Sequence, residues 1–166
     1  MQQLFPAEGE LVPRVRFGEF EGEWEEMTLE DIASFSSGGT PSKDVPEFWG
    51  GKIPWISAAS MYSTIIEKSD SNITEFAVSK GARIAKKGTL LILVRGSMLY
   101  NRIPMGITSK EVAFNQDVKA LTLKKNILDF FLLYQLMAKE SQILNAVSVT
   151  GIGAGKLDTN DLKQFS

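Results

Sequence analysis

The segment Thr89-Leu-Leu-Ile-Leu-Val94 is the longest apolar run in the chain. It has the length of a strand and is far shorter than the ~20 residues that a helix needs to cross a bilayer. Its apolar residues follow one another without polar alternation, which is typical of a strand covered on both faces. We therefore predict a buried strand that ends at Arg95-Gly96-Ser97.

Segments on both sides of this run predict further strands. They are residues 52–57, residues 102–108 and residues 112–123. Pro54 lies in the first segment and cannot donate a backbone hydrogen bond, so we expect an edge strand or a strand start there. In the last segment the side chains of Asn115-Gln116 can bond to nearby backbone, and we favour this structural role for them.

Three segments carry the signals of a helix start. Thr28-Leu-Glu-Asp31 has the spacing of a capping box, which predicts a short helix through Phe35. Asn126 is expected to cap a longer helix, rich in apolar side chains, that runs to about Val147. Either residue of Asp158-Thr159 can cap a last short element.

Polar and glycine-rich segments predict the loops and the domain organisation. We expect loops at residues 36–42 and 147–156, because glycine permits backbone conformations that other residues avoid. Residues 1–20 are expected to be a lead-in, and residues 21–166 a single domain. Together the elements predict a mixed α/β (α+β) fold, with a twisted, largely antiparallel sheet and a packed C-terminal helix.

The composition excludes several classes of function. Of the 166 residues, 43% are hydrophobic, which is enough for the core of one domain. There is no Cys and no His, so the chain alone cannot build a thiol nucleophile, a disulfide, a Cys/His zinc site or a His general base. We expect no metal and no cofactor. The absence of Cys fits a reducing cytoplasm, and Met1-Gln-Gln3 does not open a signal peptide, so we expect a cytoplasmic protein without a membrane partner.

Local motifs do not indicate catalysis. The segment Thr150–Leu157 is rich in glycine, but Thr150 and Leu157 occupy the places where a P-loop needs its first Gly and its Ser or Thr. Paired carboxylates such as Asp44 and Glu47 have no recognisable partners, and no Ser lies in a nucleophile elbow. We therefore expect a chain that is not an enzyme. The glycines could still serve a function, because small residues let the backbone come close to another chain or to a phosphate, whose charge Lys156 would balance. The alternative is that the segment is a surface loop without such a function.

Charge is unevenly distributed along the chain. Residues 1–79 hold five basic and fourteen acidic side chains, whereas residues 80–125 hold ten basic side chains against Glu111 and Asp117. A basic block within a protein of net charge -2 can serve as a local face for anions. The alternative is that alternate strand residues simply point their Lys and Arg side chains into water.

The polar loops carry the residue types that read duplex DNA. Arg pairs with guanine, Asn and Gln pair with adenine, and Ser, Thr and Tyr bond to phosphates or base edges. We expect base or near-base contacts from a cluster after the buried strand and from two further loops, and phosphate contacts from three lysines. The candidates for the bases are Thr40, Arg95, Tyr100, Asn101 and Arg102, and those for phosphates are Lys86, Lys87 and Lys156. Ser42, Lys43, Ser60, Tyr62 and Ser97 are further candidates for DNA binding in the same loops.

Several short motifs occur together and in order over residues 14–166. They are Gly22-Glu-Trp24, Leu29-Glu-Asp-Ile32, Gly38-Gly-Thr-Pro-Ser42, Ile53-Pro-Trp-Ile56, Gly88-Thr-Leu-Leu91 with Arg95-Gly96, Phe114-Asn-Gln-Asp117, Phe130-Phe-Leu-Leu-Tyr134, and a Gly-rich loop before Asp161-Leu162. This set resembles a target recognition domain of the specificity (S) subunit of type I restriction-modification systems. Residues 1–20 resemble the end of the central conserved helix of such a subunit, which implies its second, C-terminal domain.

The resemblance implies a division of labour. In that family the specificity subunit carries two such domains, each reading one half of a split site in double-stranded DNA through long loops that face the DNA. Methylation and cleavage belong to separate modification and restriction subunits, which are the implied partners. A catalytically inert chain fits this expectation.

A second function remains open from the residues alone. Trp24, Trp49, Trp55 and Tyr62 could anchor a protein- or glycan-binding module without a DNA function. For Trp55 we favour packing in the core, because Ile53 and Ile56 flank it. The two functions differ in their response to salt: phosphate contacts release counterions and weaken as salt rises, whereas an aromatic-anchored interface changes little.

Overall fold

A five-stranded sheet holds the predicted buried strand in its middle. The structure is a computed structural model that describes residues 2–7, 9–124, 127–150 and 153–166. The sheet order is β1-β10-β6-β8-β3, with antiparallel pairs except for the parallel pair β3 and β8. All four residues of β6 are buried, which confirms the prediction for this run. The strands are β1 (Ala33–Ser37), β3 (Ile65–Ile66), β6 (Leu90–Leu93), β8 (Met105–Thr108) and β10 (Val118–Leu123).

A second sheet of four strands, in the order β4-β2-β9-β5, lies beside the first. Pro54 is in β2, an inner strand of this sheet, so the edge position predicted for it is wrong. The N–H of Trp55 donates to the carbonyl of Ser71 on the β4 side, so the nitrogen of Pro54 faces β9, where pairing begins only at Trp55 and Ala113. The proline therefore removes no ladder bond. The strands are β2 (Trp49–Ile56), β4 (Asn72–Ile73), β5 (Ile84–Ala85) and β9 (Val112–Phe114).

A third, three-stranded sheet replaces the loop predicted at residues 147–156. Here β11 (Val147–Thr150) and β12 (Ala154–Leu157) form an antiparallel hairpin, and β12 also pairs with β7 (Arg95–Gly96). Gly155 serves close packing, because a Cβ there would lie 2.8 Å from the Cβ of Leu99. Gly155 therefore marks a strand position that neighbouring residues approach closely, whereas Gly153, with a φ of +74°, lies in the turn between the two strands.

The helices are shorter than the sequence predicts. The capping box of Thr28 and Asp31 is confirmed at α1 (Leu29–Ile32), but the chain enters β1 at Ala33, before the predicted end at Phe35. The single helix predicted from Asn126 to about Val147 is two helices, α3 (Asp129–Ala138) and α4 (Glu140–Asn145), and Asn126 lies outside the described residues. Asp158 caps α5 (Thr159–Gln164), as predicted.

Five other short elements complete the description. They are α2 (Glu75–Ser79) and the 3-10 turns η1 (Gln2–Leu4), η2 (Pro46–Phe48), η3 (Ala58–Ser60) and η4 (Ser97–Tyr100). Within the described ranges no helix combines the length and the apolar character that crossing a membrane requires. The prediction of a mixed fold with largely antiparallel sheets and a packed C-terminal helix is confirmed.

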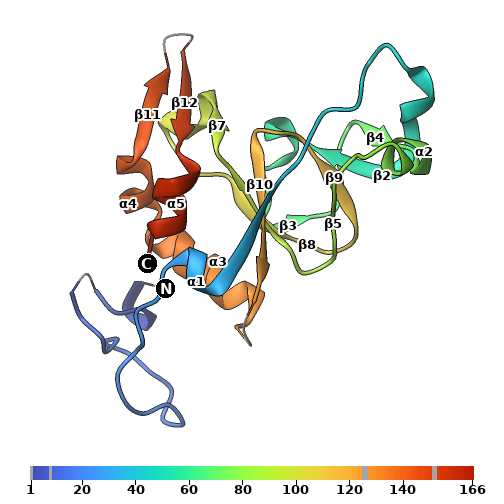
Figure 1. Cartoon of the computed structure of the whole chain (residues 1–166). Helices are drawn as coiled ribbons and strands as arrows, with labels where there is room; N and C mark the ends of the chain where they lie inside the picture. The colour runs from blue at the N-terminus through green and yellow to red at the C-terminus, as the bar shows by residue number, and fades with distance from the viewer. Residues whose placement is uncertain (1, 8, 125–126, 151–152) are drawn as a thin grey trace.

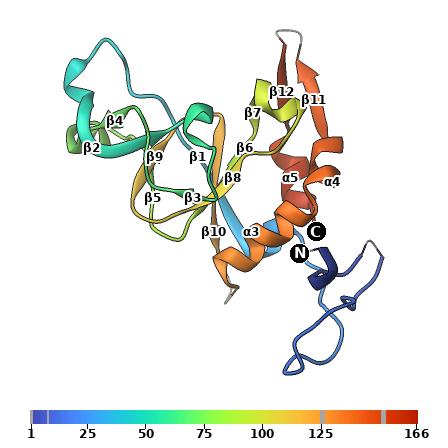
Figure 2. The same ribbon diagram turned by 180° about the vertical axis from the view of Figure 1, so that it is seen from behind.

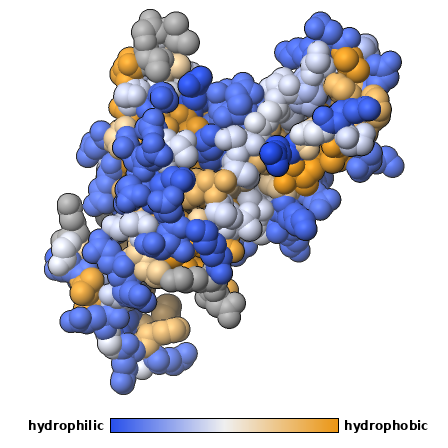
Figure 3. All heavy atoms as spheres, viewed as in Figure 1, coloured by the Kyte–Doolittle hydropathy of each residue, from blue (hydrophilic) through white to orange (hydrophobic). Residues whose placement is uncertain are grey.

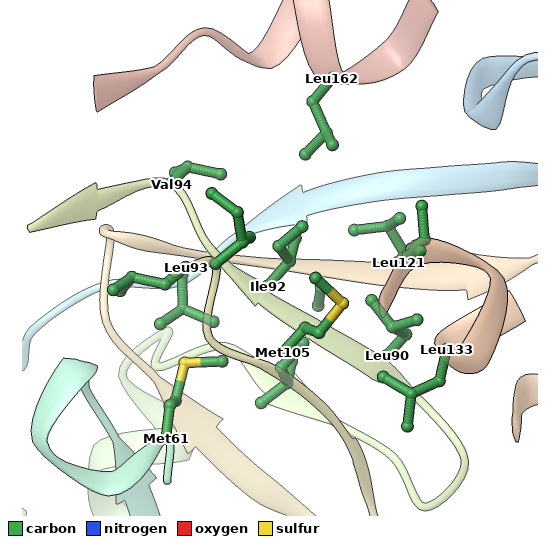
Figure 4. Packing of buried hydrophobic residues seen from close by; sticks show 14 of the residues in the cluster. Met61, Leu90, Ile92, Leu93, Val94, Met105, Leu121, Leu133 and Leu162 are labelled. Carbon is green, nitrogen blue, oxygen red and sulfur yellow. The ribbon is translucent and has the colours of Figure 1, made fainter. Parts of the chain in front are cut away.

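The core forms where α3 and α5 cover the five-stranded sheet. Leu90 to Leu93 are at most 1% exposed and belong to one buried cluster with Leu133 of α3, Leu162 of α5 and Met105 of β8. Figure 4 shows Leu90, Ile92 and Leu93 with these three side chains around them. The second sheet has a smaller core of its own around Ile73, Ala77 and Ala113. Figures 1 and 2 show the result: the hairpin stands with α3, α4 and α5 on one side of the central sheet, and the second sheet extends with α2 from the other.

Candidate nucleic-acid interface

The strand directions bring several polar segments to one edge of the central sheet. In the antiparallel order, β1 and β6 end at the edge where β10 and β8 begin. Three backbone hydrogen bonds tie the segments together: Val94 to Asp117, Gly39 to Phe114, and Asn115 to Ile56 at the end of β2. We call this the upper edge, as it lies in Figure 1, and define it as residues 37–43, 57–62, 95–102 and 115–117 together with Lys156.

The upper edge holds eleven of the thirteen predicted site residues. Figure 3 shows that the outline of the molecule is indented between the hairpin and the second sheet, and that the surface facing the indentation is mostly hydrophilic. Most of the eleven side chains are exposed, whereas Ser60 is buried and Lys156 is partly buried. The residues are Thr40, Ser42, Lys43, Ser60, Tyr62, Arg95, Ser97, Tyr100, Asn101, Arg102 and Lys156.

A row of polar side chains crosses the three-stranded sheet. Arg95 of β7 is directly opposite Lys156 of β12, which is in turn opposite Ser148 of β11. Residues opposite one another on paired strands project from the same face, so the two cations lie side by side. Lys156 Nζ is 3.5 Å from a carboxylate oxygen of Asp158, so only part of this charge is balanced.

The neighbouring carboxyl of Asp158 stays ionised. A hydrogen bond from the backbone N–H of Asn160 is the main cause that lowers the pKa of Asp158, and the charge of Lys156 adds to it. The carboxylate therefore serves chiefly as the helix cap of α5 and also borders the cationic row.

The cluster after the buried strand is built on a short turn. Leu99 of η4 is buried, while Tyr100 is 44% exposed and Asn101 and Arg102 are exposed. The N–H of Ile103 donates to a carboxylate oxygen of Glu140 at 2.6 Å and so fixes the end of the cluster to α4. The polar side chains are thus presented by backbone that is anchored on both sides.

Lys86 and Lys87 lie at the opposite edge of the sheet. They precede β6, whereas Arg95 follows it, and the hydroxyl of Thr108 at the far end of β8 donates to the carbonyl of Lys86. Lys124, at the end of β10, also lies at that edge and donates to the carbonyl of Glu30. The basic block does not form one face, so the interpretation of residues 80–125 as a single anion-binding surface is wrong.

In the turn before β10 the predicted structural role is confirmed for Asn115, whereas for Gln116 it is wrong. Asn115 closes the turn, because its Oδ1 accepts from the N–H of Asp117 at 3.1 Å. Gln116 is exposed, and its Oε1 accepts a hydrogen bond from the hydroxyl of Thr40 at 2.9 Å. The position of a strand end beside another loop is a tertiary feature, so no local signal could have marked Gln116.

Three of the four aromatic residues of the alternative function have structural partners. Trp55 is partly buried against the second core and donates to the carbonyl of Gly39, which confirms its packing role. Trp49 packs against Trp55 with ring centroids 5.4 Å apart, and Trp24 packs against Phe131 at the same distance. Tyr62 remains 68% exposed. Among the described residues no group of three or more acidic side chains could hold a metal ion.

Comparison with known proteins finds a family model and relatives of one kind, the specificity proteins of type I restriction enzymes. Residues 21–166 match the family model of the Type I restriction modification DNA specificity domain. A specificity subunit of the type I restriction enzyme EcoR124I/EcoR124II from Escherichia coli is 36% identical over 147 residues, which cover 87% of this chain and 36% of the relative. The MjaIX specificity subunit of Methanocaldococcus jannaschii is 32% identical over 136 residues, 79% of this chain and 31% of the relative. The chain spans about a third of the length of these relatives.

Solved structures share the fold at low sequence identity. The HsdS subunit from Thermoanaerobacter tengcongensis superimposes with a TM-score of 0.59 and 16% identity, over 82% of this chain and 30% of that chain. A chain from a study of complex assembly and conformational transition of the type I R-M system gives a TM-score of 0.61 and 16% identity, over 82% and 31%.

Proposed function

Because the chain belongs to the family of type I restriction-modification DNA specificity domains, we propose that it recognises one half of a split site in double-stranded DNA through its upper edge. The observation that carries the proposal is the assembly, at this edge, of polar segments from separate parts of the chain around the cationic pair Arg95 and Lys156. A surface that combines cations with amide and hydroxyl groups can bind phosphates and read bases at once.

The upper edge offers a different chemistry at each position. Arg95 and Arg102 can pair bidentately with guanine, and Asn101 with adenine. Thr40 and Tyr100 can bond to bases or to the phosphates beside them. Lys156 has a single ammonium and suits a phosphate. Contacts from Ser42, Lys43, Tyr62 and Ser97 complete the proposal. Ser60 is buried and bonded to the hydroxyl of Ser69, so it supports the loop without touching DNA.

The proposed role is recognition, and the chemistry belongs to other subunits. We propose that the chain acts in the cytoplasm, is not an enzyme, and works with the modification and restriction subunits of a type I complex. Residues 21–166, which the family model covers, would form the recognition domain, in the second position of its subunit, and residues 1–20 the lead-in to it.

A separate surface suits contacts with protein. Eleven of the sixteen exposed large apolar side chains of the described part belong to the lead-in and to α3 with its preceding residue. An apolar hollow of about 530 Å³ lies between these two segments. Apolar surface of this extent is typical of a protein interface. The negative charge of residues 1–26 repels phosphates and so disfavours binding of DNA at this surface. The eleven residues are Leu4, Leu11, Val12, Val15, Phe17, Phe20, Leu128, Phe130, Phe131, Tyr134 and Met137.

A binding profile over randomised duplexes tests the proposed function. The chain and the complete subunit that carries it should both select a short sequence, with an affinity that falls steeply as salt rises. Arg95→Ala or Arg102→Ala should relax the preference at one base pair by about 1–3 kcal/mol, and Lys156→Ala should weaken all sequences alike. Identical profiles for the Arg and Lys variants would contradict the assignment of roles. Binding that salt does not change would favour the aromatic-anchored module.

A further inference from the structure

The side chain of Gln116 projects from a turn that is held rigidly without it. The Asn115 side chain closes the turn, the N–H of Asn115 donates to the carbonyl of Ile56, and the carbonyl of Asp117 accepts from the N–H of Val94. These bonds fix the turn to β2 and to the end of β6. The Gln116 side chain contributes to none of them, so its exposed amide is not needed to build the turn.

The partner of Gln116 comes from a loop that is equally fixed. A Cβ on Gly38 would lie 2.0 Å from the carbonyl oxygen of Phe114, so the loop backbone packs directly on the strand before the turn. The N–H of Gly39 donates to that same carbonyl, and the indole of Trp55 donates to the carbonyl of Gly39. Thr40 follows at once, and its hydroxyl donates to Gln116 Oε1 at 2.9 Å.

We propose that Gln116 is a specificity-determining residue that reads an adenine, and that Thr40 is the residue that positions it. This inference rests on the proposed function. An adenine edge in the major groove offers an N6 amino donor and an N7 acceptor, and a glutamine amide matches both. With one lone pair of Oε1 taken by Thr40, the other accepts from N6–H and the Nε2 group donates to N7.

The geometry favours recognition of a base by Gln116, because its side-chain amide already has a hydrogen-bond partner in the chain without DNA. A free glutamine must give up side-chain rotamers when it binds, whereas the hydroxyl of Thr40 already holds Gln116 at the upper edge. Thr40 was expected to touch the bases itself; in this inference it acts through Gln116.

Binding profiles over randomised duplexes test the inference with paired variants. Gln116→Ala should lose the preference for adenine at one position by about tenfold or more and leave the other positions unchanged. Thr40→Val keeps the shape of the side chain but removes the hydroxyl, and it should weaken the same position to a lesser degree. Thr40→Ser keeps the hydroxyl and should retain the preference. Gln3→Ala, outside the upper edge, is the matched glutamine control and should match the parent chain.

The outcomes separate the inference from the proposed function. A parent chain without any sequence preference would overturn both. A selective parent with an unchanged Gln116→Ala profile, or with a change at a position that is not adenine, would overturn the inference alone. A Thr40→Val profile equal to that of the parent would overturn the positioning role. Equal midpoints of thermal unfolding for all variants would establish that the differences arise in binding.

Discussion

Arg95 and Lys156 are directly opposed on the neighbouring antiparallel strands β7 and β12. Like charges in this arrangement destabilise a sheet by about 0.2–1 kcal/mol, because the side chains project from the same face at close range. An anion bound between the two cations would relieve this repulsion. The same two residues should therefore oppose stability in the free chain and favour binding to DNA.

The first prediction is that Arg95→Ala changes stability and binding in opposite directions. Removing the repulsion should leave the free energy of unfolding unchanged or raise it by up to about 1 kcal/mol, while the affinity for duplex DNA falls. Urea unfolding and fluorescence anisotropy on the same preparation measure the two quantities. A variant that is less stable and binds DNA as well as the parent would refute the role of the pair.

The second prediction concerns the loop that carries Thr40. Gly38→Ala should destabilise the chain by about 1–3 kcal/mol or more, because the new methyl group collides with the carbonyl oxygen of Phe114. Gly39→Ala is the matched control, since a Cβ there meets nothing within 4 Å and its φ is not positive. Denaturant midpoints of the two variants measure the difference. Equal midpoints would show that the contact of Gly38 with the strand is not tight in solution.

Local patterns predict the elements of this fold better than their arrangement. The apolar run at Leu90–Leu93 and the capping box at Thr28 depend on neighbours in the sequence, and both are confirmed. The predictions of an edge position for Pro54 and of a loop at Gly155 are wrong for a different reason. The surroundings of both residues come from strands far away in the chain, which no local pattern contains.

The third prediction concerns the stability of the fold at acidic pH. The carboxylate of Glu30 accepts from Lys163 at 2.8 Å and from Gln164 at 3.2 Å, and so joins α1 to α5. The hydrogen bond from Lys163 is the main cause that lowers the pKa of Glu30 below its ordinary value of 4.5. A lowered pKa in the folded state stabilises the fold above pH 4.5, and this contribution is lost as the pH falls through the folded value.

Thermal unfolding as a function of pH measures this contribution. The parent chain should lose more stability between about pH 5 and about pH 3 than Glu30→Gln does, because the variant has no proton to take up at this position. Lys163→Met should reduce the dependence on pH in the same way. Parallel curves for all three proteins would show that the contact does not form in solution.

The fourth prediction concerns the apolar surface. Phe17 and Phe20 are 67% and 66% exposed, so changing both to Ser should disturb the fold little. The double variant should bind the modification subunit more weakly, by about tenfold or more, and should keep its affinity for duplex DNA. Phe76→Ser, which alters another exposed aromatic residue, at α2 of the second sheet, is the control. Unchanged assembly by the double variant would exclude this surface as the interface.

The sequence predicts the types of residue in the candidate site but not which of them lie together. Ten basic residues in one stretch of sequence predicted a single face, but β6 separates Lys86 and Lys87 from Arg95, because a strand carries its two ends to opposite edges of the sheet. The contribution of Lys156 was expected from its charge alone. Its place beside Arg95 depends on the pairing of β12 with β7, and Lys156 lies 61 positions after Arg95 in the chain.

Charge reversal at the two edges of the central sheet is the most direct test of the account. Arg95→Glu with Lys156→Glu alters the upper edge, and Lys86→Glu with Lys87→Glu makes the same change in net charge at the opposite edge. Affinity for duplex DNA is measured for both double variants at one salt concentration. The account predicts a loss of roughly a hundredfold for the first pair and little change for the second. An equal or larger loss for the Lys86 and Lys87 pair would contradict it.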